Sequence, residues 1–571
     1  MNYTHHNNEL TEKNINQAVY LKGWVGKVRN LGGLIFVDLR DRFGVTQLVI
    51  KPDNPFYQEA LKLRNEFVIE VKGVVIERES KNKNMHTGSV EVEVNHLNIF
   101  SKAENPPMII ANETDALEDT RLKYRYLDLR RPVMQNYLIK RHEITQAIRR
   151  SLLRQSFYEL ETPILGKSTP EGARDYLVPS RLYPKQFYAL PQSPQIYKQL
   201  FMIAGFERYF QVAKCFRDED LRADRQPEFT QIDIEASFIK ADDIMTLTET
   251  LLKDTFKDVL DIDLKTPFIK MTYQDAMDQY GTDKPDMRYA YLLKDYTDLF
   301  NHLDIPLFND APVIKGIVSD QLEPFTRKQI DQLAELVKKH HGKALAYLKK
   351  QDGTITGSIV KFLDQETIDA LKLNDGEILF LVPGTYEDVS QSLGVLREKI
   401  ANLLNIIPKD VYKFVWITDW PLLEYSEEDQ RYFAKHHPFT QPTDVDMLKN
   451  NPKEALANAY DVVLNGYELG GGSMRIYNQD VQQLMFETLG LTKEDIQTRF
   501  GFFVDALKYG TPPHGGIALG LDRMVMLLTH THNIKDVIAF PKTQSARDLM
   551  MDAPTEVDEV QLNDLKIKVG S

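Results

Sequence analysis

The chain has 571 residues, of which 42% are hydrophobic and 10% aromatic, and it carries a formal net charge of −13. This length exceeds what one hydrophobic core organises and predicts about three or four domains, and the composition excludes a largely disordered protein. The single cysteine, Cys215, excludes an internal disulfide framework and a zinc site built from several cysteines.

Charge and apolar patterning narrow the function classes further. A strongly negative chain does not bind nucleic acid through bulk charge. Residues 1–103, however, hold 14 Lys and Arg against 12 Asp and Glu, so a local contact is compatible with that part. No apolar leader and no uncharged run of about 18 apolar residues occurs. We therefore expect a cytoplasmic protein that does not span a membrane.

Residues 20–100 alternate between apolar and polar side chains in five runs, with a short helical stretch at residues 57–65. This pattern predicts a small Greek-key barrel of the OB type, which binds single-stranded nucleic acid on its open face. Arg29, Phe36 and Gln47 lie on or beside successive strands. A lone aromatic in a strand is more often core, so the pattern alone favours a packing role for Phe36.

A basic and aromatic segment, residues 104–135, is followed by a predicted helix at residues 137–155 and a predicted strand at residues 157–165. The apolar spacing of this helix indicates core or interface rather than chemistry. Residues 166–168 look like the end of a phosphate-binding loop, but the first glycine of that motif would have to replace Glu161.

A short helix is predicted after two prolines, Pro191 and Pro194, that fix an extended turn. Gln195 and Lys198 lie three residues apart at its start, so they share one face.

Residues 209–216 and 229–235 both alternate as half-buried strands around a charged, arginine-containing loop, which predicts a long antiparallel hairpin. One face of the second strand carries Phe229, Gln231, Asp233 and Glu235. An aromatic ring can stack on a base, arginine can clamp a phosphate and a carboxylate can hold an ammonium group. This face is predicted to line a cleft, and the alternative is a solvated hairpin with paired surface charges.

Residues 280–408 have a different sequence pattern, in which predicted helices such as 326–341 and 390–405 alternate with short predicted strands. No catalytic constellation occurs there. We expect an α+β domain inserted between two parts of the active-site sheet.

The C-terminal part of the chain returns to strands. The adjacent His436 and His437 would point to opposite faces of a strand and chelate one ion poorly, so a loop beside the substrate is expected. A strand predicted at residues 461–469 carries Asp461 and Glu468, which can give oxygen ligands to magnesium held mainly by substrate phosphates.

Glycines mark two further strands. Gly470–Gly472 permit close backbone approach, and Arg475 beyond them would bind a substrate carboxylate if it lay near Lys198. The glycine-rich stretch 515–520 leads into a helix with Arg523 in its first turn. A cation there opposes the helix dipole, which indicates a ligand.

Three segments carry a family resemblance. FRDED at residues 216–220 and RQPEFTQID at residues 225–233 are similar to the second signature motif of class II aminoacyl-tRNA synthetases, in the bacterial-type aspartyl form. The helix and strand ending near Pro163 resemble the first motif, which packs at a twofold dimer interface, and GLDR at residues 520–523 resembles the third. The resemblance covers nearly the whole chain.

The resemblance implies an α+β multidomain protein. It has an N-terminal OB-fold β-barrel, a class II antiparallel sheet with flanking helices, and an inserted α+β domain of the GAD-like kind. The implied parts are an anticodon-binding domain (1–103), a hinge (104–135), two catalytic parts (136–287 and 411–555), the insertion (288–410) and a tail (556–571). From Asp552 onward we expect short strand or loop.

The resemblance also implies a reaction, the ligation of L-aspartate to tRNA(Asp) by a homodimer, with ATP as a substrate and Mg²⁺ as the metal ion. The aspartate α-carboxylate attacks the α-phosphorus of ATP in line, pyrophosphate leaves, and the terminal ribose hydroxyl of the tRNA then attacks the adenylate. This chemistry needs positioning and charge stabilisation but no protein nucleophile, so Cys215 is expected to be inert packing.

Single residues receive roles from the same resemblance. Arg217 and Arg523 are implied to be catalytic, with Phe229 and Arg523 enclosing adenine. The implied ATP-binding residues are Arg217, Asp218, Glu219, Gln226, Phe229, Gln231, Glu468, Gly520, Leu521, Asp522 and Arg523. The implied aspartate-binding residues are Glu171, Ser193, Gln195, Lys198, Arg217, Asp233, His436 and Arg475. The implied metal ligands are Asp461 and Glu468, and the implied anticodon-reading residues are Arg29, Phe36, Gln47 and Glu91.

Specificity is implied to be electrostatic. Lys198 and Arg475 would pair with the side-chain carboxylate of aspartate, while Asp233 and its neighbours would surround the ammonium group. An amide would leave two buried cations poorly satisfied, so asparagine should be rejected without an editing domain.

Three alternatives stay open. An asparaginyl or lysyl relative shares the motifs, but asparaginyl enzymes lack the long insertion, and QSPQ at residues 192–195 with Lys198 favours aspartate. An enzyme that also charges tRNA(Asn) is the second, and Leu31 disfavours it because relaxed bacterial forms often carry histidine there. A catalytically silent paralogue with an RNA-binding or regulatory role is the third, and the intact Arg217, Glu468 and Arg523 disfavour it.

Overall fold

The structure is a computed structural model that describes residues 3–169, 173–221 and 224–570. The chain forms two compact units. One unit runs through Leu138 and includes residues 539–543 and 547–554, and the other holds the remainder. Among the described residues, no helix is long and apolar enough to cross a membrane.

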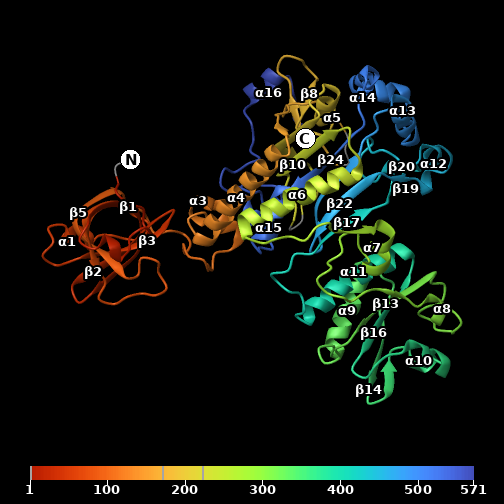
Figure 1. Ribbon diagram of the computed structural model, residues 1–571, viewed down its shortest axis with the longest axis horizontal. Coiled ribbons are helices and arrows are strands. Elements are labelled where there is room, and N and C mark those ends of the chain that lie inside the picture. Colours follow the sequence, from red (N-terminus) through yellow and green to blue (C-terminus); the bar gives the residue numbers. More distant parts are fainter. Residues whose placement is uncertain (1–2, 170–172, 222–223, 571) are drawn as a thin grey trace. The chain divides into compact units, whose positions relative to one another are not determined.

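The N-terminal unit contains a closed barrel with the strand order β1-β2-β3-β5-β4 (Figure 1). Its strands are β1 (Ala18–Leu31), β2 (Leu34–Asp41), β3 (Gly44–Ile50), β4 (Val68–Glu77) and β5 (Val90–Ser101), with α1 (Tyr57–Ala60) before β4. Ile35, Val37 and Leu39 of β2 point into the core, whereas Phe36 lies on the opposite face, half-buried. The predicted OB-type barrel is confirmed, and Phe36 is not part of its core.

The second unit is built around an eight-stranded sheet with the order β11-β17-β22-β23-β24-β10-β9-β6. Its strands are β11 (Ile269–Thr272), β17 (Phe414–Thr418), β22 (Ala459–Leu464), β23 (Tyr467–Met474), β24 (His514–Gly520), β10 (Glu228–Ser237), β9 (Arg208–Phe216) and β6 (Tyr158–Glu159). The strands pair antiparallel except at the edges, where β11 and β6 pair parallel.

Helices cover this sheet, as Figure 1 shows for α6 (Ala241–Leu260) and α15 (Leu521–Leu528). α15 and α5 (Gln195–Ile203) pack against β10. The long helix predicted at residues 137–155 is α4 (Pro132–Arg154), which begins earlier because proline is tolerated in a first helical turn. The predicted antiparallel sheet with flanking helices is confirmed.

The predicted hairpin is also confirmed. β9 and β10 pair antiparallel, with Asp233 opposite Gln211. Ile232 and Ile234 are fully buried on one face of β10, which leaves Gln231 and Asp233 on the other.

Three predicted elements differ. The strand expected at residues 461–469 is the hairpin of β22 and β23, because Asn465 and Gly466 (φ 53° and 87°) form a two-residue turn. The strand expected at residues 157–165 is limited to β6, followed by one more hydrogen bond from the Leu160 N–H to the Phe210 carbonyl oxygen at 3.1 Å. The tail, expected to be strand or loop, contains α16 (Glu559–Leu565), which begins after Asp558 in an N-cap position.

Residues between α7 (Tyr273–Tyr280) and β17 form a second, five-stranded sheet with the order β12-β13-β16-β14-β15. Its strands are β12 (Lys294–Asp295), β13 (Val313–Ser319), β16 (Ile378–Gly384), β14 (Ala346–Gln351) and β15 (Thr354–Gly357). Its helices are α8 (Thr297–Phe300), α9 (Arg327–Lys339), α10 (Gln365–Leu371) and α11 (Tyr386–Leu403). α9 and α11 contribute to one hydrophobic core and α8 and α10 to another. The expected inserted α+β fold is confirmed.

Candidate active site

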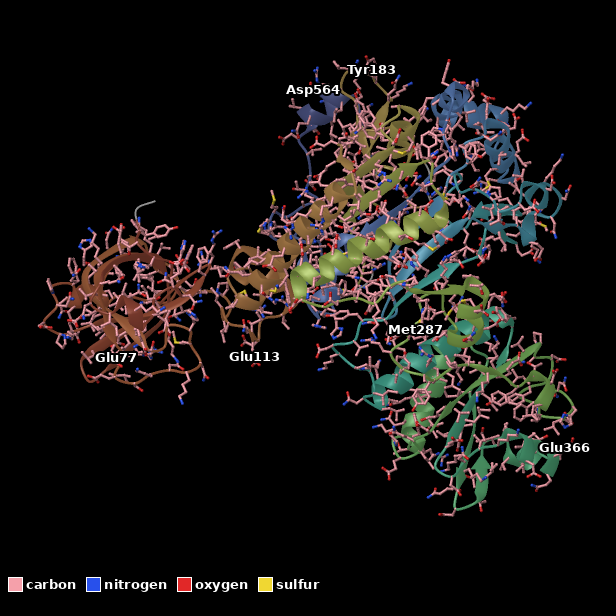
Figure 2. All side chains as sticks on the ribbon, viewed as in Figure 1. Glu77, Glu113, Tyr183, Met287, Glu366 and Asp564 are labelled. Atoms are coloured by element: carbon pink, nitrogen blue, oxygen red, sulfur yellow. The ribbon has the colours of Figure 1, made fainter. Side chains whose placement is uncertain are left out.

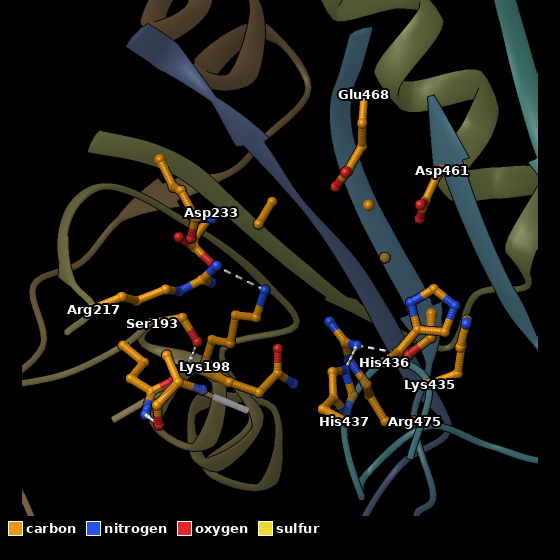
Figure 3. A pocket seen from close by; sticks show the side chains of 18 of the residues that line it. Ser193, Lys198, Arg217, Asp233, Lys435, His436, His437, Asp461, Glu468 and Arg475 are labelled. Atoms are coloured by element: carbon orange, nitrogen blue, oxygen red, sulfur yellow. Dashed lines mark hydrogen bonds and ion pairs between the residues drawn. The ribbon is translucent and has the colours of Figure 1, made fainter. Parts of the chain in front are cut away.

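A cavity of about 380 Å³ lies on the eight-stranded sheet (Figure 3). It gathers many of the predicted site residues from distant parts of the sequence. Those on its lining are Ser193, Gln195, Lys198, Arg217, Glu219, Gln231, Asp233, His436, Asp461, Glu468 and Arg475. Antiparallel pairing of β10, β24, β23 and β22 brings these segments together.

A buried cluster of four charges lies at the cavity, and three of its members, Lys198, Asp233 and Arg475, line it. Arg475 makes a bidentate pair with Glu235, with Nε 2.9 Å from Oε1 and Nη2 3.1 Å from Oε2. The Lys198 ammonium lies 3.1 Å from Asp233 Oδ1 and 3.4 Å from Glu235 Oε2. Each of the four side chains is at most 2% exposed. Two cations and two carboxylates therefore balance one another inside the protein.

The charge balance is reflected in the pKa values. Burial works against the charged form of Glu235, but Arg475 and Lys198 outweigh it and hold the pKa of this carboxyl below its usual value. The pKa of Asp233 is raised by burial, despite Lys198. Asp233 Oδ2 has no hydrogen-bond partner among the described residues. Asp233 is therefore the carboxylate with an oxygen left for a ligand cation.

Glu235 is a site residue that the sequence analysis placed on the right face but gave no role. Its signal was the strand alternation that it shares with Asp233. The glycine strand β24 makes room for it, since a Cβ on Gly516 would lie 2.0 Å from Glu235 Oε2. Glycine is therefore required where the carboxylate crosses β24.

His437 was expected in a loop beside the substrate, together with His436, but was given no specific role. It lies in the loop after β20 (Arg431–Ala434), and its Nε2 accepts a hydrogen bond from Arg475 Nη1 at 2.6 Å. On the other side of the ring, Nδ1 accepts from the Phe439 N–H at 3.2 Å and lies 3.3 Å from Thr440 Oγ1. His437 therefore orients the guanidinium of Arg475 from the side opposite Glu235.

The neighbouring His436 lines the cavity itself. Burial lowers its pKa to about 4, and its Nε2 has no hydrogen-bond partner among the described residues. The ring packs edge-on against Trp420, with 5.0 Å between centroids. His436 is thus a neutral ring that presents a nitrogen to the cavity.

Asp461 and Glu468 project from neighbouring strands of the β22–β23 hairpin on another side of the cavity (Figure 3). A Cβ on Gly471 would lie 2.5 Å from Asp461 Oδ1, an oxygen that lacks a hydrogen-bond partner among the described residues. Burial and the negative charge of Glu468 raise the pKa of Asp461 well above its usual value. For Glu468, Lys284 and Arg523 outweigh burial and lower the pKa.

These two carboxylates fit a divalent cation. Magnesium takes one or two carboxylates together with substrate phosphates and water. Within the described ranges, no group of three His, Cys, Asp or Glu side chains could hold a metal ion by itself. Oxygens of a bound nucleotide would complete the coordination.

Further predicted nucleotide-binding residues surround the cavity. The guanidinium of Arg217 lies over the ring of Phe229 at 5.0 Å, and its Nε is without a hydrogen-bond partner among the described residues. Arg523 donates to the carbonyl oxygen of Glu468 and pairs with Asp224 at 3.2 Å. The guanidinium of Arg217 is therefore held at Phe229 and that of Arg523 at Glu468.

The remaining predicted residues take other positions. Asp522 is 3% exposed, pairs with Arg141 and accepts from the Thr230 N–H at 2.8 Å, so its carboxylate fastens α15 to β10. Asp218 pairs with Arg174 at 3.4 Å. Gln226 is buried, and Gly520 and Leu521 join β24 to α15. Glu171 lies outside the described residues.

Cys215 is fully buried in β9, and its Sγ lies 3.4 Å from Gln231 Oε1. This position is consistent with the expected packing role.

The barrel brings the four predicted anticodon residues together. Arg29 stands opposite Phe36 in the β1–β2 register and donates to Gln47 Oε1 at 3.0 Å. Gln47 Nε2 donates to Glu91 at 2.5 Å, and Arg78, which was not predicted, donates to Gln47 Oε1 at 2.7 Å. These side chains form one polar network on the face that carries Phe36.

Comparison with known families decides which kind of protein this is. Residues 117–544 match the tRNA synthetases class II (D, K and N) and residues 19–100 match the OB-fold nucleic acid binding domain. The chain belongs to the class II tRNA synthetases. The resemblance drawn from the three motifs is therefore confirmed.

Relatives of this class II synthetase match over nearly their whole length. An "Aspartate--tRNA ligase" of Macrococcus caseolyticus is 52% identical over 98% of this chain and 97% of its own. One of Aster yellows witches'-broom phytoplasma is 51% identical over 99% and 98%. An "Aspartate--tRNA(Asp/Asn) ligase" of a Geobacillus species is 51% identical over 100% and 98%.

Solved structures share the fold of this synthetase at low identity. An asparaginyl-tRNA synthetase from Pyrococcus horikoshii complexed with asparaginyl-adenylate has a TM-score of 0.62 at 20% identity, covering 95% of this chain and 99% of its own. An aspartyl-tRNA synthetase from Entamoeba histolytica has a TM-score of 0.58 at 20% identity, covering 95% and 91%.

Proposed function

We propose that this class II synthetase ligates L-aspartate to tRNA(Asp) in two steps, with ATP as its second substrate. The observation that carries the proposal is the pair of buried cations, Lys198 and Arg475, that line the cavity. Full-length relatives named aspartate--tRNA ligase support it. A small acid with two carboxylates and one ammonium group complements this cluster of charges.

Aspartate would bind to those donors and acceptors of the charge cluster that are not used by contacts within the protein. Lys198 donates one of its three N–H groups to Asp233 and forms an ion pair with Glu235, so it keeps a donor for the side-chain carboxylate of the substrate. Arg475, fixed by Glu235 and His437, offers a second cation. Asp233 Oδ2 accepts from the substrate ammonium, together with Gln195 and Ser193.

The first chemical step needs positioning rather than a protein nucleophile. A substrate α-carboxylate oxygen attacks the α-phosphorus of ATP in line, the bond to the bridging oxygen breaks, and pyrophosphate leaves with the bonding electrons. The guanidinium of Arg217 binds the α-phosphate and the attacking carboxylate. The Phe229 ring and Arg523 enclose adenine, and Glu219 accepts from the adenine amino group.

Asp461 and Glu468 hold magnesium in this scheme. Magnesium, when bound with ATP, neutralises phosphate charge as it builds on the leaving group. The two carboxylates would hold the ion and so determine where its positive charge meets the phosphates. The adenylate is then opened by the terminal ribose hydroxyl of the tRNA, and AMP leaves.

The barrel reads the anticodon in this proposal. Phe36 is half-buried on a strand face with Arg29 and Gln47 beside it, so its ring is available to stack on a base. Relatives of equal identity carry both the Asp and the Asp/Asn name. We propose tRNA(Asp) alone, because this chain has Leu31, at the end of β1, where relaxed bacterial forms often carry histidine.

A homodimer in the cytoplasm completes the proposal. The helix and strand of the first motif, and the segment that follows the strand, leave apolar side chains exposed, which a second copy would cover. These side chains are Leu153 (59%), Tyr158 (63%), Ile164 (42%) and Leu165 (51%). Light scattering of the full chain checks this, and a monomer at micromolar concentration would contradict it.

The experiment that tests the function is ATP–pyrophosphate exchange with aspartate or asparagine, followed by charging of purified tRNA(Asp) and tRNA(Asn). We expect exchange with aspartate alone and charging of tRNA(Asp) alone. Absence of aspartate-dependent exchange would overturn the enzymatic proposal. Charging of both tRNAs would overturn the strict discrimination only.

A further inference from the structure

A lysine outside the three motifs reaches the proposed metal carboxylates. Lys284 lies in the segment between α7 and the inserted sheet, a segment that Met287 marks in Figure 2. Its Nζ is 3.4 Å from Glu468 Oε2. The side chains of Lys284 and Glu468 are 38% and 34% exposed, so the pair lies at the open edge of the cavity.

Stability does not explain this ion pair. Pairs with this much solvent access contribute little to folding because water screens them. The pair does offset a local excess of negative charge, since Glu468 lies beside Asp461 and Asp283 adds a third carboxylate nearby. Lys284 thus supplies positive charge where nucleotide phosphates would meet the metal carboxylates.

The backbone that carries Lys284 is held firmly. Arg397 of α11 is 2% exposed and donates to the carbonyl oxygens of Asp286 at 2.9 Å and Tyr289 at 2.8 Å. Its guanidinium lies over the rings of Tyr280 and Tyr289, at 4.8 and 4.0 Å. The inserted domain therefore anchors the segment on one side.

The β22–β23 turn anchors it on the other side. A Cβ on Gly466 would lie 3.3 Å from the Cβ of Asp286, so glycine lets the segment approach this turn closely. Pro285, directly after Lys284, is buried. Lys284 consequently has a fixed backbone, a flexible four-carbon side chain and a solvated ammonium group.

We propose that Lys284 binds the β- and γ-phosphates of ATP and the pyrophosphate that leaves, moving from Glu468 to the phosphates when nucleotide and metal enter. The inference rests on the proposed function. When a divalent cation takes the carboxylates, Glu468 no longer needs the lysine, and the phosphates bring new negative charge to the same edge of the cavity. Lys284 then stabilises the charge that builds on pyrophosphate as the bond to the α-phosphorus breaks, and no proton is transferred.

The test is calorimetric titration of the full chain with ATP, pyrophosphate and AMP, each in the presence of Mg²⁺. Lys284→Met should bind ATP and pyrophosphate about tenfold or more weakly, as expected for the loss of one charge-assisted hydrogen bond. AMP lacks the β- and γ-phosphates, so its affinity should not change. Lys284→Arg should recover most of the lost affinity.

Lys270→Met is the matched control, because Lys270 forms a surface pair with Asp242 and is 50% exposed. It should bind all three ligands as the unaltered chain does. Unchanged pyrophosphate affinity in Lys284→Met would overturn the inference, and so would an equal loss of AMP affinity, which would indicate a distorted segment. Aspartate-dependent exchange by the unaltered chain tests the proposed function separately.

Discussion

Arg475 and Glu235 form a bidentate ion pair that water does not reach, with N–O distances of 2.9 and 3.1 Å between residues 240 positions apart in the sequence. Their side chains are 2% and 0% exposed. Burying two charges costs desolvation that the attraction barely repays. The pair is therefore better explained by its effect on the orientation of Arg475 than by stability.

Removing one partner of this pair should be costly. Glu235→Gln keeps the shape but leaves Arg475 and Lys198 short of one negative charge, so we expect a loss of about 3 kcal/mol in stability. The KM for aspartate should rise at least about tenfold, since Arg475 loses a charge-assisted partner. Thermal unfolding and aspartate-dependent exchange measure the two effects.

Glu335→Gln is the control for that variant. Glu335 pairs with Lys338 at the surface of the inserted domain, where the two side chains are 75% and 56% exposed. Its loss should cost no more than about 1 kcal/mol. Equal stability of the two variants would contradict the cost assigned to the buried pair.

The aspartate pocket is tested by Lys198→Leu and Arg475→Leu. Each change removes one cation that the substrate side-chain carboxylate needs, so aspartate-dependent pyrophosphate exchange should disappear while ATP binding persists. Lys214→Leu, an exposed position on the β9 strand of the same hairpin, should exchange normally. Normal exchange in either pocket variant would defeat the pocket assignment.

Replacing one of the proposed metal carboxylates should leave stability unchanged or raise it, but should increase the magnesium requirement of the reaction. Asp461→Asn removes one of two neighbouring negative charges, so the unfolding temperature without magnesium should rise or stay the same. The magnesium concentration needed for half-maximal exchange should increase several-fold, because one ligand is weakened. A magnesium titration of exchange measures this.

Gly471→Ala offers an independent check on the same site. Its Cβ would lie 2.5 Å from Asp461 Oδ1 and would displace that carboxylate. The magnesium requirement should increase here as well. An unchanged requirement in both variants would exclude Asp461 as a metal ligand.

The buried histidine predicts a pH dependence of stability. Burial lowers the pKa of His436 from 6.5 to about 4, so between these values the unfolded chain binds the proton and the folded chain does not. Stability from this group is complete above about pH 6.5 and falls as the pH drops toward about 4. Lowered pKa values of His437 and His514 act in the same direction.

Unfolding temperatures measured between about pH 7 and pH 5 should therefore decrease for the unaltered chain and decrease less for His436→Asn. His532→Asn, at an exposed position, should keep the original slope. Identical slopes for all three proteins would show that His436 does not remain neutral on folding.

A change on the network face of the barrel should affect the charging of tRNA without affecting adenylate formation. Phe36→Ala should weaken charging of tRNA(Asp) about tenfold or more, the expected effect of losing one stacked base. Adenylate formation should not change, and stability should change little, because Phe36 lies on the face opposite the core residues Ile35 and Val37. Ile35→Ala, by contrast, should destabilise the barrel by about 2 kcal/mol or more.

Much of the fold followed from local pattern. Period-two alternation in residues 209–216 and 229–235 was sufficient to predict the β9–β10 hairpin and the face that carries Asp233, because a strand has only two faces. The 461–469 stretch shows the limit of that approach. Val462, Val463 and Leu464 form an apolar run without alternation, and the turn is indicated instead by the Asn465–Gly466 dipeptide, whose two residues both have positive φ.

The sequence by itself determined the reaction class, through three short motifs with fixed chemistry, and it placed Lys198, Asp233 and Arg475 among the candidates. Only the tertiary structure decided how their charges are shared. Glu235 orients Arg475, His437 holds it from the other side and Lys284 reaches Glu468 from outside every motif. Such pairings depend on distances between strands and loops far apart in the chain, and local spacing carries no information about those distances.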